Sequence, residues 1–386
     1  MVAASWCGEG SGLSEVHRCF DDGLLKAEFN GEETIAMSRI PVTILGATGV
    51  VGQRFVRRLA DHPLFEILHL AASLRSTGKT YEDACVWRLD GEPYGGLRKQ
   101  ALRAAHPSEA LSPVVFSALD SGPASEIEPL FAAKGSLVFS NASAFRMAKD
   151  VPLLVPEANA DHIGLIETQR KARGWKGAIV CNPNCTATVL VMGLAPLHQA
   201  FGIERVLMTS MQAISGAGYP GVPSLDILGN VIPFIRNEEE KVEEETPKML
   251  GRFVGGGVET APFTISAMCH RVPVLEGHSE AVSVTLRGSP SPDQVTEVFR
   301  AWRGDPRVSP LHTAPEVPIR VHTAEDRPQV RLDVEKDGGM SAHVGRVRRC
   351  PLLGIKFALL GHNTERGAAG ASVLNAELAH ALGYLG

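Results

Sequence analysis

The sequence predicts an α/β protein in which a doubly wound parallel sheet is followed by a second, α+β domain. Three observations carry this prediction. Short apolar runs alternate with helical patterns from Val42 to Val180, the rhythm of repeated βα units. After Gly202 that rhythm stops, and the glycine-rich loop 215–221 begins a different arrangement. At 386 residues the chain is long enough to bury two cores.

These patterns set the predicted boundaries. They are an extension at 1–38, a first domain at 39–185 joined by the C-terminal helix 363–386, and a second domain at 186–362. Residues 1–38 are rich in Gly, Ser and Glu and show little periodicity, so we expect a disordered extension there.

The composition argues against several classes of protein. The net charge is −5 and the lysines and arginines are scattered, so we expect no nucleic-acid partner. No apolar run approaches the length of a spanning helix and the first residues do not resemble a secretory signal, so we expect no membrane association. Seven cysteines, an odd number spread from Cys7 to Cys350, fit reduced thiols and a cytoplasmic location.

The first βα unit carries a glycine turn. A strand at 42–45 is followed by Gly46-Ala47-Thr48-Gly49-Val50-Val51-Gly52 and by a helical pattern through Leu59. In a Rossmann-type domain, glycines at this place let the backbone approach a pyrophosphate, and the helix start offers N–H donors. The alternative is a glycine turn that only packs the helix on the strand.

The second strand, at 66–71, indicates which dinucleotide would bind. A domain that prefers NAD usually has an acid at this strand end to hold the ribose 2′-hydroxyl. This chain has Ala72-Ser73-Leu74-Arg75-Ser76-Thr77-Gly78-Lys79, two cations and no acid, which suits a 2′-phosphate. The sequence therefore predicts NADP, with a solvated surface turn as the alternative.

Further strands at 114–118 and 137–140, with a helix around 127–133 between them, continue the parallel sheet. A polar loop follows the second of these strands, where such sheets bind ligands. Arg146 in that loop is a candidate for holding an anion, although a lone arginine there is more often a surface charge.

Cys185 is the candidate nucleophile. A strand ends at Ile179 and Val180, Asn182-Pro183-Asn184 is turn chemistry, and an apolar helix follows from Ala187. Unpaired N–H groups and the helix dipole favour a thiolate at this place. Two alternatives are an inert packed cysteine and, with Cys181, half of a zinc site, for which the chain shows no second ligand pair.

The second domain supplies further candidates. We predict a strand at 205–214, paired strands at 264–274 and 281–286, a helix at 293–302, and strands at 317–321, 329–334 and 355–360. Between the paired strands His278 follows a glycine, where an imidazole suits proton transfer, although an isolated histidine is more often packed or exposed. The acidic run 238–245 is expected to be mostly a solvated helix face, on which Glu238 and Lys241 lie together.

Five motifs in this order closely resemble the aspartate-semialdehyde dehydrogenases, in their archaeal and fungal branch. They are G-A-T-G-V-V-G, C-N-P-N-C, Q-A-I-S-G-A-G-Y-P-G, R-V-P-V-L-E-G-H-S-E and N-T-E-R-G-A-A-G. The resemblance runs from about residue 40 to the end. It implies reversible, NADPH-dependent reductive dephosphorylation of 4-phospho-L-aspartate to L-aspartate 4-semialdehyde, on the route to lysine, threonine, methionine and isoleucine. It also implies inorganic phosphate as a reactant, and a homodimer or homotetramer formed through the second, catalytic domain.

The same resemblance implies roles for particular residues. Cys185 resembles the nucleophile and His278 the acid/base, and Arg271 resembles the clamp on the substrate α-carboxylate. The other substrate positions are Gln212, Arg146, Asn184, Glu238 and Lys241. The positions that resemble cofactor contacts are Gly46, Thr48, Gly49, Val50, Val51, Ser73, Arg75, Ser76, Gly216 and Asn363. The resemblance implies no metal.

Three points stay open in the sequence. An acyl-coenzyme A reductase of the malonyl-CoA reductase type could share this fold and its glycine motifs, although the Asn-Pro-Asn and Arg-Val-Pro-Val segments argue against that interpretation. A redox sensor that binds NADP without turnover is a second alternative. Cys181 stands where many relatives carry serine; we interpret it as a core residue, with oxidative pairing to Cys185 as a hypothesis.

Overall fold

The first sheet positions the candidate cofactor and thiol sites. The computed structural model describes residues 39–91 and 93–385, so the prediction for residues 1–38 lies outside the described residues. Six strands form a sheet in the order β3-β2-β1-β4-β5-β6, and every pair is parallel. This confirms the predicted doubly wound sheet. The strands are β1 Ile40–Leu45, β2 Phe65–Ala72, β3 Arg103–Ala104, β4 Val114–Ser117, β5 Leu137–Ser140 and β6 Ala178–Cys181.

Helices cover this sheet. They are α1 Val50–Leu59, α2 Tyr81–Ala84, α3 Pro107–Ala110, α4 Ser121–Lys134, α5 Pro156–Asn159 and α6 Leu165–Arg173, with short 3₁₀ turns η1 Pro93–Gly96 and η2 Ala160–Gly164. Helix α4 ends at Gly135, whose φ of 109° is strained for other residues, and this lets the chain turn directly into β5. The buried phenylalanines Phe55, Phe116 and Phe139 stack beside one another in the core of this sheet.

The second sheet is mixed. Its order is β10-β7-β11-β14-β13-β12. Its strands are β7 Ile203–Gln212, β10 Thr264–Arg271, β11 His278–Leu286, β12 Ile319–Val321, β13 Ala342–Cys350 and β14 Gly354–Gly361, and β8 Arg252–Val254 and β9 Gly257–Glu259 form a separate hairpin. The remaining helical elements are η3 Ile214–Ala217, α7 Cys185–Phe201, α8 Ser224–Ile227, α9 Glu238–Met249, α10 Pro292–Ala301, α11 Val330–Asp333, η4 Lys336–Gly339, η5 Glu365–Ala369 and α12 Gly370–Ala381.

The structure corrects two predictions for this sheet. Strands β10 and β11 do not pair with each other, because β7 lies between them and bonds both. Residues 329–334 are not a strand: 330–333 form α11, where the Asp333 carboxylate accepts the Gln329 amide at 2.8 Å and folds the segment back on itself. Alternating apolar residues show which face is buried but not which strand is the neighbour, and local side-chain bonds can override the alternation.

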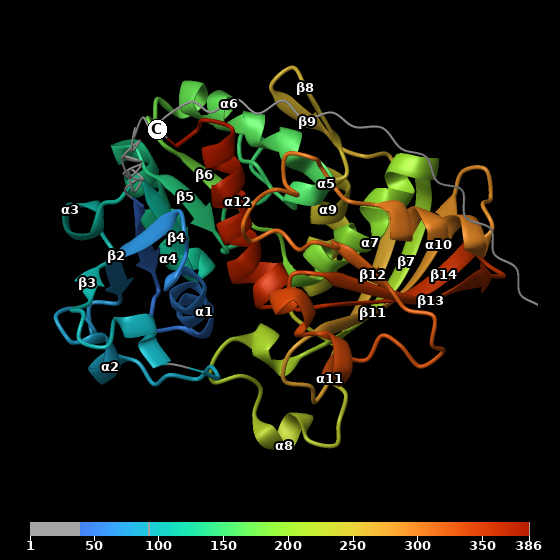
Figure 1. The fold of residues 1–386 in the computed structure, drawn as a ribbon, viewed down its shortest axis with the longest axis horizontal. Coiled ribbons are helices and arrows are strands. Elements are labelled where there is room, and N and C mark those ends of the chain that lie inside the picture. Colours follow the sequence, from blue (N-terminus) through green and yellow to red (C-terminus); the bar gives the residue numbers. More distant parts are fainter. Residues whose placement is uncertain (1–38, 92, 386) are drawn as a thin grey trace, which may run out of the picture. The chain divides into compact units, whose positions relative to one another are not determined.

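Helix α7 and the C-terminal segment tie the two sheets together. Helix α7 starts at the end of β6 and packs against β7, β11, β13 and β14, and its buried side chains join one continuous core. Helix α12 returns to the first sheet, as predicted, and lies against α1, β4 and β5 (Figure 1). Val373, Leu374 and Leu378 complete the core there.

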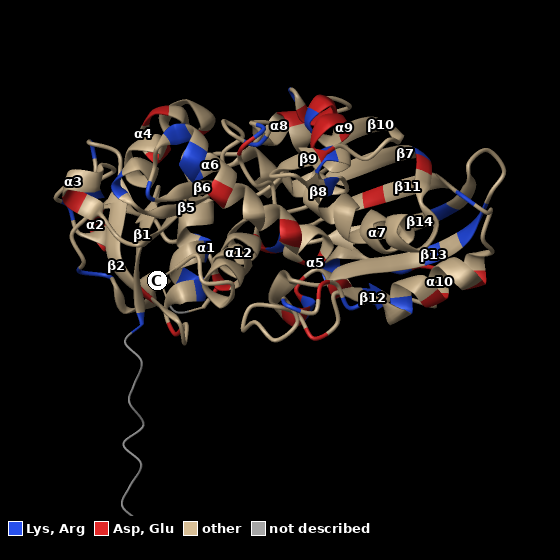
Figure 2. Ribbon diagram, turned by 90° about the horizontal axis from the view of Figure 1, so that it is seen from above, with Lys and Arg blue, Asp and Glu red and all other residues tan. Residues whose placement is uncertain are grey.

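Charges of both signs are interspersed along the ribbon, with the acidic residues of α9 grouped on one helix (Figure 2). Among the described residues, no helix has the length and apolar character that crossing a membrane requires.

Candidate active site

Cys185 is the first residue of α7, as its sequence context predicts. Asn184 caps the helix, because its side-chain oxygen accepts the amides of Thr186 and Ala187 at 2.9 and 3.0 Å. Cys185 keeps part of its surface accessible, although its sulfur lies in the interior. The turn therefore fixes the sulfur at the boundary between the two sheets.

His278 faces this sulfur. It is the first residue of β11, it is fully buried, and its Nε2 lies 3.2 Å from the Sγ of Cys185. The Ala213 amide donates to Nδ1 at 3.2 Å. In the neutral ring the hydrogen then sits on Nε2, the nitrogen that points at the sulfur. Residues 93 positions apart in the chain thus form one thiol–imidazole pair.

The register of the second sheet brings two more predicted residues to His278. Arg271 on β10 stands beside Gln212 on β7, and β11 is registered so that His278 stands on the other side of Gln212. All three side chains are buried. Because neighbours in register project from the same face of a sheet, they form one row across three strands.

Gly216 lies against this row. A Cβ at this position would come within 2.8 Å of the Arg271 guanidinium and 3.3 Å of the His278 ring. The η3 turn can therefore lie this close to Arg271 and His278 only because position 216 is a glycine. The predicted cofactor contact of Gly216 is not tested by this geometry.

Helix α9 brings two carboxylates to Asn184. Glu238 accepts the Asn184 side-chain amide at 2.9 Å. The Lys241 Nζ lies 3.9 Å from the Glu238 Oε2 on the same helix face, as predicted. Glu245 accepts the Asn184 backbone amide at 2.6 Å and the Arg146 guanidinium at 3.1 Å. Glu238 and Glu245 are buried, so the prediction of a mostly solvated face is wrong for these two.

Burial dominates the electrostatics of the thiol. It raises the pKa of Cys185 to about 12, and Glu238 adds to that rise, while Arg146, Arg271 and the Thr186 amide act in the opposite direction. This corrects the expectation that the helix start alone favours a thiolate. Desolvation outweighs the Thr186 amide at the helix start here.

The pKa of the His278 imidazole is shifted in the other direction. Burial, followed by the charge of Arg271, lowers the pKa of His278 to about 3. Both shifts favour a neutral thiol and a neutral ring over a thiolate–imidazolium ion pair.

The glycine turn has the geometry of a dinucleotide site. Gly46 has a φ of +74°, and a Cβ there would lie 2.7 Å from the Ala118 carbonyl oxygen. Gly49 caps α1, and no described side chain bonds the first-turn amides, which leaves the Val50 and Val51 N–H groups for a pyrophosphate. A Cβ at Gly52 would overlap the backbone of the turn, so this third glycine serves packing, the alternative weighed above.

The predicted 2′-phosphate residues follow β2. Ser73 and Arg75 are exposed, Ser76 is partly buried, and Arg75 makes no ion pair within the described residues. Asn363 has a different setting: its amide accepts the Gly277 N–H at 2.7 Å and donates to Ser215 at 2.8 Å. Asn363 therefore anchors the loop before His278, and its cofactor contact stays a prediction.

Several residues of the two sites have no signal in the sequence. Tyr81 and Gln53 donate to the Ala47 and Thr48 carbonyls at 2.8 and 3.1 Å, which holds the glycine turn in shape. Lys248 donates to the carbonyls of Arg146, Ala148 and Val151. Each acts through backbone atoms brought together by folding, so no spacing in the sequence could have identified them.

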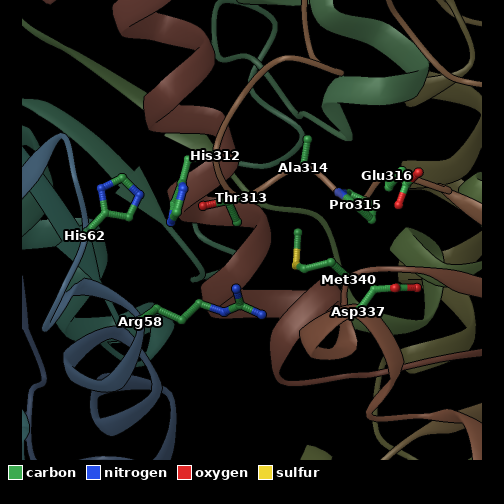
Figure 3. A pocket seen from close by; sticks show the side chains of 9 residues that line it. All are labelled: Arg58, His62, His312, Thr313, Ala314, Pro315, Glu316, Asp337 and Met340. Carbon is green, nitrogen blue, oxygen red and sulfur yellow. The ribbon is translucent and has the colours of Figure 1, made fainter.

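A cavity of about 320 Å³ lies beside α1, apart from the thiol site (Figure 3). None of the predicted site residues lines it. Two of its charged side chains are already engaged, Arg58 with Glu365 and Asp337 with Arg320, and the third, Glu316, is exposed.

One group of three described residues, His322, Asp333 and His343, has potential metal-ligand atoms within 4.8 Å of one another. Arg327 and Lys336 already bind the Asp333 carboxylate, the latter at 3.1 Å. A divalent cation would have to approach two fixed positive charges, so the chemistry of this group favours an ion-pair network.

Two family models match the chain. Residues 41–166 match the NAD binding domain of semialdehyde dehydrogenases, and residues 194–366 match their dimerisation domain. A parallel dinucleotide-binding sheet joined to a mixed sheet, both matched in this way, defines the class as a semialdehyde dehydrogenase.

Comparison with individual relatives identifies the family within this class of semialdehyde dehydrogenases. Aspartate-semialdehyde dehydrogenases of Archaeoglobus fulgidus and Schizosaccharomyces pombe are 51% and 45% identical, over 88% of this chain and 98% and 97% of theirs. The crystal structure of the Candida albicans enzyme with NADP matches with a TM-score of 0.82 and 40% identity, over 89% of this chain and 99% of that one. The chain belongs to the aspartate-semialdehyde dehydrogenase family.

Proposed function

We propose that the chain catalyses the reversible, NADPH-dependent reductive dephosphorylation of 4-phospho-L-aspartate to L-aspartate 4-semialdehyde. Family membership supports this activity. The single observation that carries the chemistry is the 3.2 Å contact between the Cys185 sulfur and the His278 Nε2.

Cys185 is the proposed nucleophile. Its sulfur attacks the carbonyl carbon, the bond from that carbon to the phosphate oxygen breaks, and the thiol proton leaves with the phosphate, so a thioester remains. The Asn184 side chain already accepts the Thr186 and Ala187 amides, so we assign the Cys185 amide to the developing oxyanion. Because the thiol starts protonated, proton loss accompanies the attack.

His278 is the proposed acid. Bound NADPH supplies the hydride that reduces the thioester carbon. Hydride addition leaves a thiohemiacetal oxyanion on the Cys185 sulfur, and the His278 Nε2–H beside that sulfur donates a hydrogen bond to it. When the carbon–sulfur bond breaks, the oxyanion becomes the aldehyde oxygen, and the ring passes a proton, replaced from water, to the departing sulfur, which restores the thiol. The low pKa of His278 keeps the ring neutral at rest, with its hydrogen on Nε2.

The substrate is proposed to lie over the row of Arg271, Gln212 and His278. The planar guanidinium of Arg271 suits the α-carboxylate, and its Nη1 is oriented by the Ala213 carbonyl at 2.7 Å. Gln212 orients the substrate beside the thiol. Arg146 and Lys241 offer positive charge for phosphate, and Glu238 offers negative charge for the substrate ammonium, with Asn184 holding Glu238 in place.

NADP is proposed to bind along the first sheet. The amides of α1 and the turn from Gly46 to Val51 would hold the pyrophosphate, and Ser73, Arg75 and Ser76 the 2′-phosphate. Gly216 and Asn363 would line the nicotinamide end. Domain roles follow: 39–185 with 363–386 binds the cofactor, and 186–362 carries catalysis and dimerisation.

We also propose a homodimer, with a tetramer as a pair of such dimers. The outer face of the second sheet supports it, because Leu207, Met211 and Met268 are 46%, 38% and 54% exposed on the face opposite α7. The biosynthetic relatives and the free thiols of the described cysteines support a cytoplasmic location.

The test of the nucleophile is Cys185→Ser. We expect turnover to fall by about 10⁴-fold or more, because a serine hydroxyl is a poorer nucleophile and leaving group than a thiol. NADPH binding, measured by fluorescence titration, should stay near that of the wild type. Cys181→Ser, four residues away in the buried strand, is the matched control and should retain activity. Substantial turnover by Cys185→Ser would remove Cys185 from this role.

One spectrophotometric assay separates the alternatives. With aspartate semialdehyde, the proposed enzyme reduces NADP only when phosphate is present. A coenzyme A-dependent reductase would need coenzyme A in place of phosphate, and a redox sensor would bind NADP without turnover. The relatives favour the first of these outcomes.

A further inference from the structure

The segment η5, Glu365–Ala369, passes directly behind Cys185. It is a single turn of π-helix, in which the Gly367 amide donates to the His362 carbonyl at 3.0 Å and the Ala369 amide to the Thr364 carbonyl at 3.1 Å. Such wide turns are rare and are found most often at functional sites. This turn contacts the start of α7.

Gly367 is the point of contact. A Cβ built on Gly367 would lie 2.6 Å from the Cβ of Cys185, which is closer than real Cβ atoms approach, and 3.0 Å from its Cα. The backbone of Gly367 does not have a positive φ, so backbone conformation would permit alanine. The absence of a side chain is required here only because Cys185 occupies the space.

The turn cannot move away easily, because its neighbours anchor it. Arg366 is fully buried, and its guanidinium donates to both oxygens of the buried Glu157 at 2.9 and 2.6 Å and to the Met340 carbonyl at 2.7 Å. The Ala368 carbonyl accepts the Asn182 side chain at 2.6 Å. Both residues next to Gly367 are therefore fixed by buried hydrogen bonds.

A second anchor comes from α1. Glu365 accepts Arg54 at 2.8 Å and Arg57 at 2.6 Å, and it also pairs with Arg58. Burial alone would raise the pKa of Glu365, but Arg58 and Arg54 hold it at about 2, so the carboxylate stays charged and bound. The turn is thus tied to the helix that follows the glycine turn.

On the other side, Cys185 has little freedom either. Asn184 is fixed by its cap bonds and by Glu245, so the first turn of α7 cannot rotate without breaking them. We propose that Gly367 is a positioning residue: its backbone, which carries no Cβ, packs against Cys185 and holds the sulfur next to the His278 ring. This inference rests on the proposed role of Cys185 in catalysis.

The first test is Gly367→Ala. A methyl group must displace either η5 or Cys185 by several tenths of an ångström or more, and a misplacement near 1 Å costs about a hundredfold in rate. We expect kcat to fall by about a hundredfold, with NADPH binding within about twofold of the wild type. The rate of Cys185 alkylation by iodoacetamide should change as well, which a remote structural defect would not cause.

Gly193→Ala is the matched control. Gly193 lies on the same helix, and its added Cβ would come 2.9 Å from a Leu359 methyl group, far along α7 from the thiol. It should lower stability but leave kcat of the folded protein near the wild-type value. A Gly367→Ala enzyme that keeps kcat within about twofold of the wild type would overturn the proposal.

A stability cycle tests the contact without using activity. Cys185→Gly removes the Cβ that a methyl group at position 367 would strike. We expect Gly367→Ala to lower the unfolding temperature strongly in the Cys185 background and much less in the Cys185→Gly background. Equal losses in both backgrounds would refute the contact. Because this cycle measures only stability, its result stands even if Cys185→Ser shows that Cys185 is not the nucleophile.

Discussion

At the scale of single residues, the site depends on competition between burial and charge. Cys185 and His278 are both held in their neutral forms, because desolvation outweighs the arginines and the helix start near them. Glu238 is the acid whose charge raises the thiol pKa, and it is held by Asn184 and Thr186. The reactivity of the thiol should therefore respond to the charge at position 238.

The residue-scale prediction is that Glu238→Gln lowers the pKa of Cys185. Removing a negative neighbour stabilises the thiolate, so alkylation by iodoacetamide at about pH 8 should be faster than in the wild type. For the wild type, the rate should rise about tenfold per pH unit and reach no plateau below about pH 10, because the pKa is raised. Turnover should fall, because Glu238 is proposed to bind the substrate ammonium.

Glu240→Gln is the control, since Glu240 is exposed on the same helix and is not among the groups that shift the thiol. It should leave the alkylation rate unchanged. An alkylation rate in Glu238→Gln that is equal to or slower than that of the wild type would contradict the electrostatic account.

At the scale of elements, α4 carries a buried acid against the carboxyl ends of two strands. Glu128 is fully buried, and one carboxylate oxygen accepts the Ser140 hydroxyl at 2.7 Å. Its other oxygen has no hydrogen-bond partner within residues 39–91 and 93–385. Burial raises the pKa of Glu128 to about 7, although the hydrogen bond from Ser140 opposes the rise. The folded protein therefore prefers the protonated acid.

This shift gives a pH-dependent stability with a defined sign. In the unfolded chain Glu128 ionises near its ordinary pKa of about 4.5, whereas in the folded protein it ionises near 7. The free energy of unfolding should therefore fall as pH rises through this window, by about 3 kcal/mol in total, and stay lower above it.

Glu128→Gln should remove this dependence, because the amide is neutral at every pH. The variant should match the wild type at about pH 4 and be up to about 3 kcal/mol more stable at about pH 8, measured from urea unfolding midpoints. Glu126→Gln, on the same helix and exposed, is the control and should follow the wild-type curve. Parallel curves for Glu128→Gln and the wild type would show that Glu128 titrates normally.

At the scale of the whole molecule, one side of the second sheet packs against α7 and carries the site, and the other exposes apolar side chains. Leu207 and Met211 on β7 and Met268 on β10 alternate with the buried residues of the same strands. An exposed apolar sheet face is typical of an interface between subunits.

We therefore predict that Met211→Lys combined with Met268→Lys converts the dimer to a monomer, measured by light scattering after size-exclusion chromatography. Two lysines on each copy place like charges in an apolar contact that must exclude water. Leu111→Lys, which changes an exposed leucine of the first sheet domain, should leave the assembly intact. A double variant with the mass of the wild-type assembly would place the interface elsewhere.

Some parts of the site could be predicted from local sequence patterns, and others could not. The helix start at Cys185, the glycine turn and the parallel sheet follow from local patterns, because caps, turns and periodicity act between near neighbours. Arg271 and Gln212 could be named only by resemblance, and His278 was a candidate only as a histidine beside a glycine, since their common row depends on β7 lying between β10 and β11. Glu245 and Gly367 were missed, because an acidic run and a glycine carry no sign of what they will touch.

By itself, the sequence determined the fold class, the family and the identity of the candidate nucleophile. Only the tertiary structure decided which strand separates β10 from β11, which acids of α9 are buried, and that the thiol and the imidazole are neutral. The physical reason is range: propensity and capping act over a few residues, whereas desolvation and contact depend on chain segments that meet only when the whole protein folds.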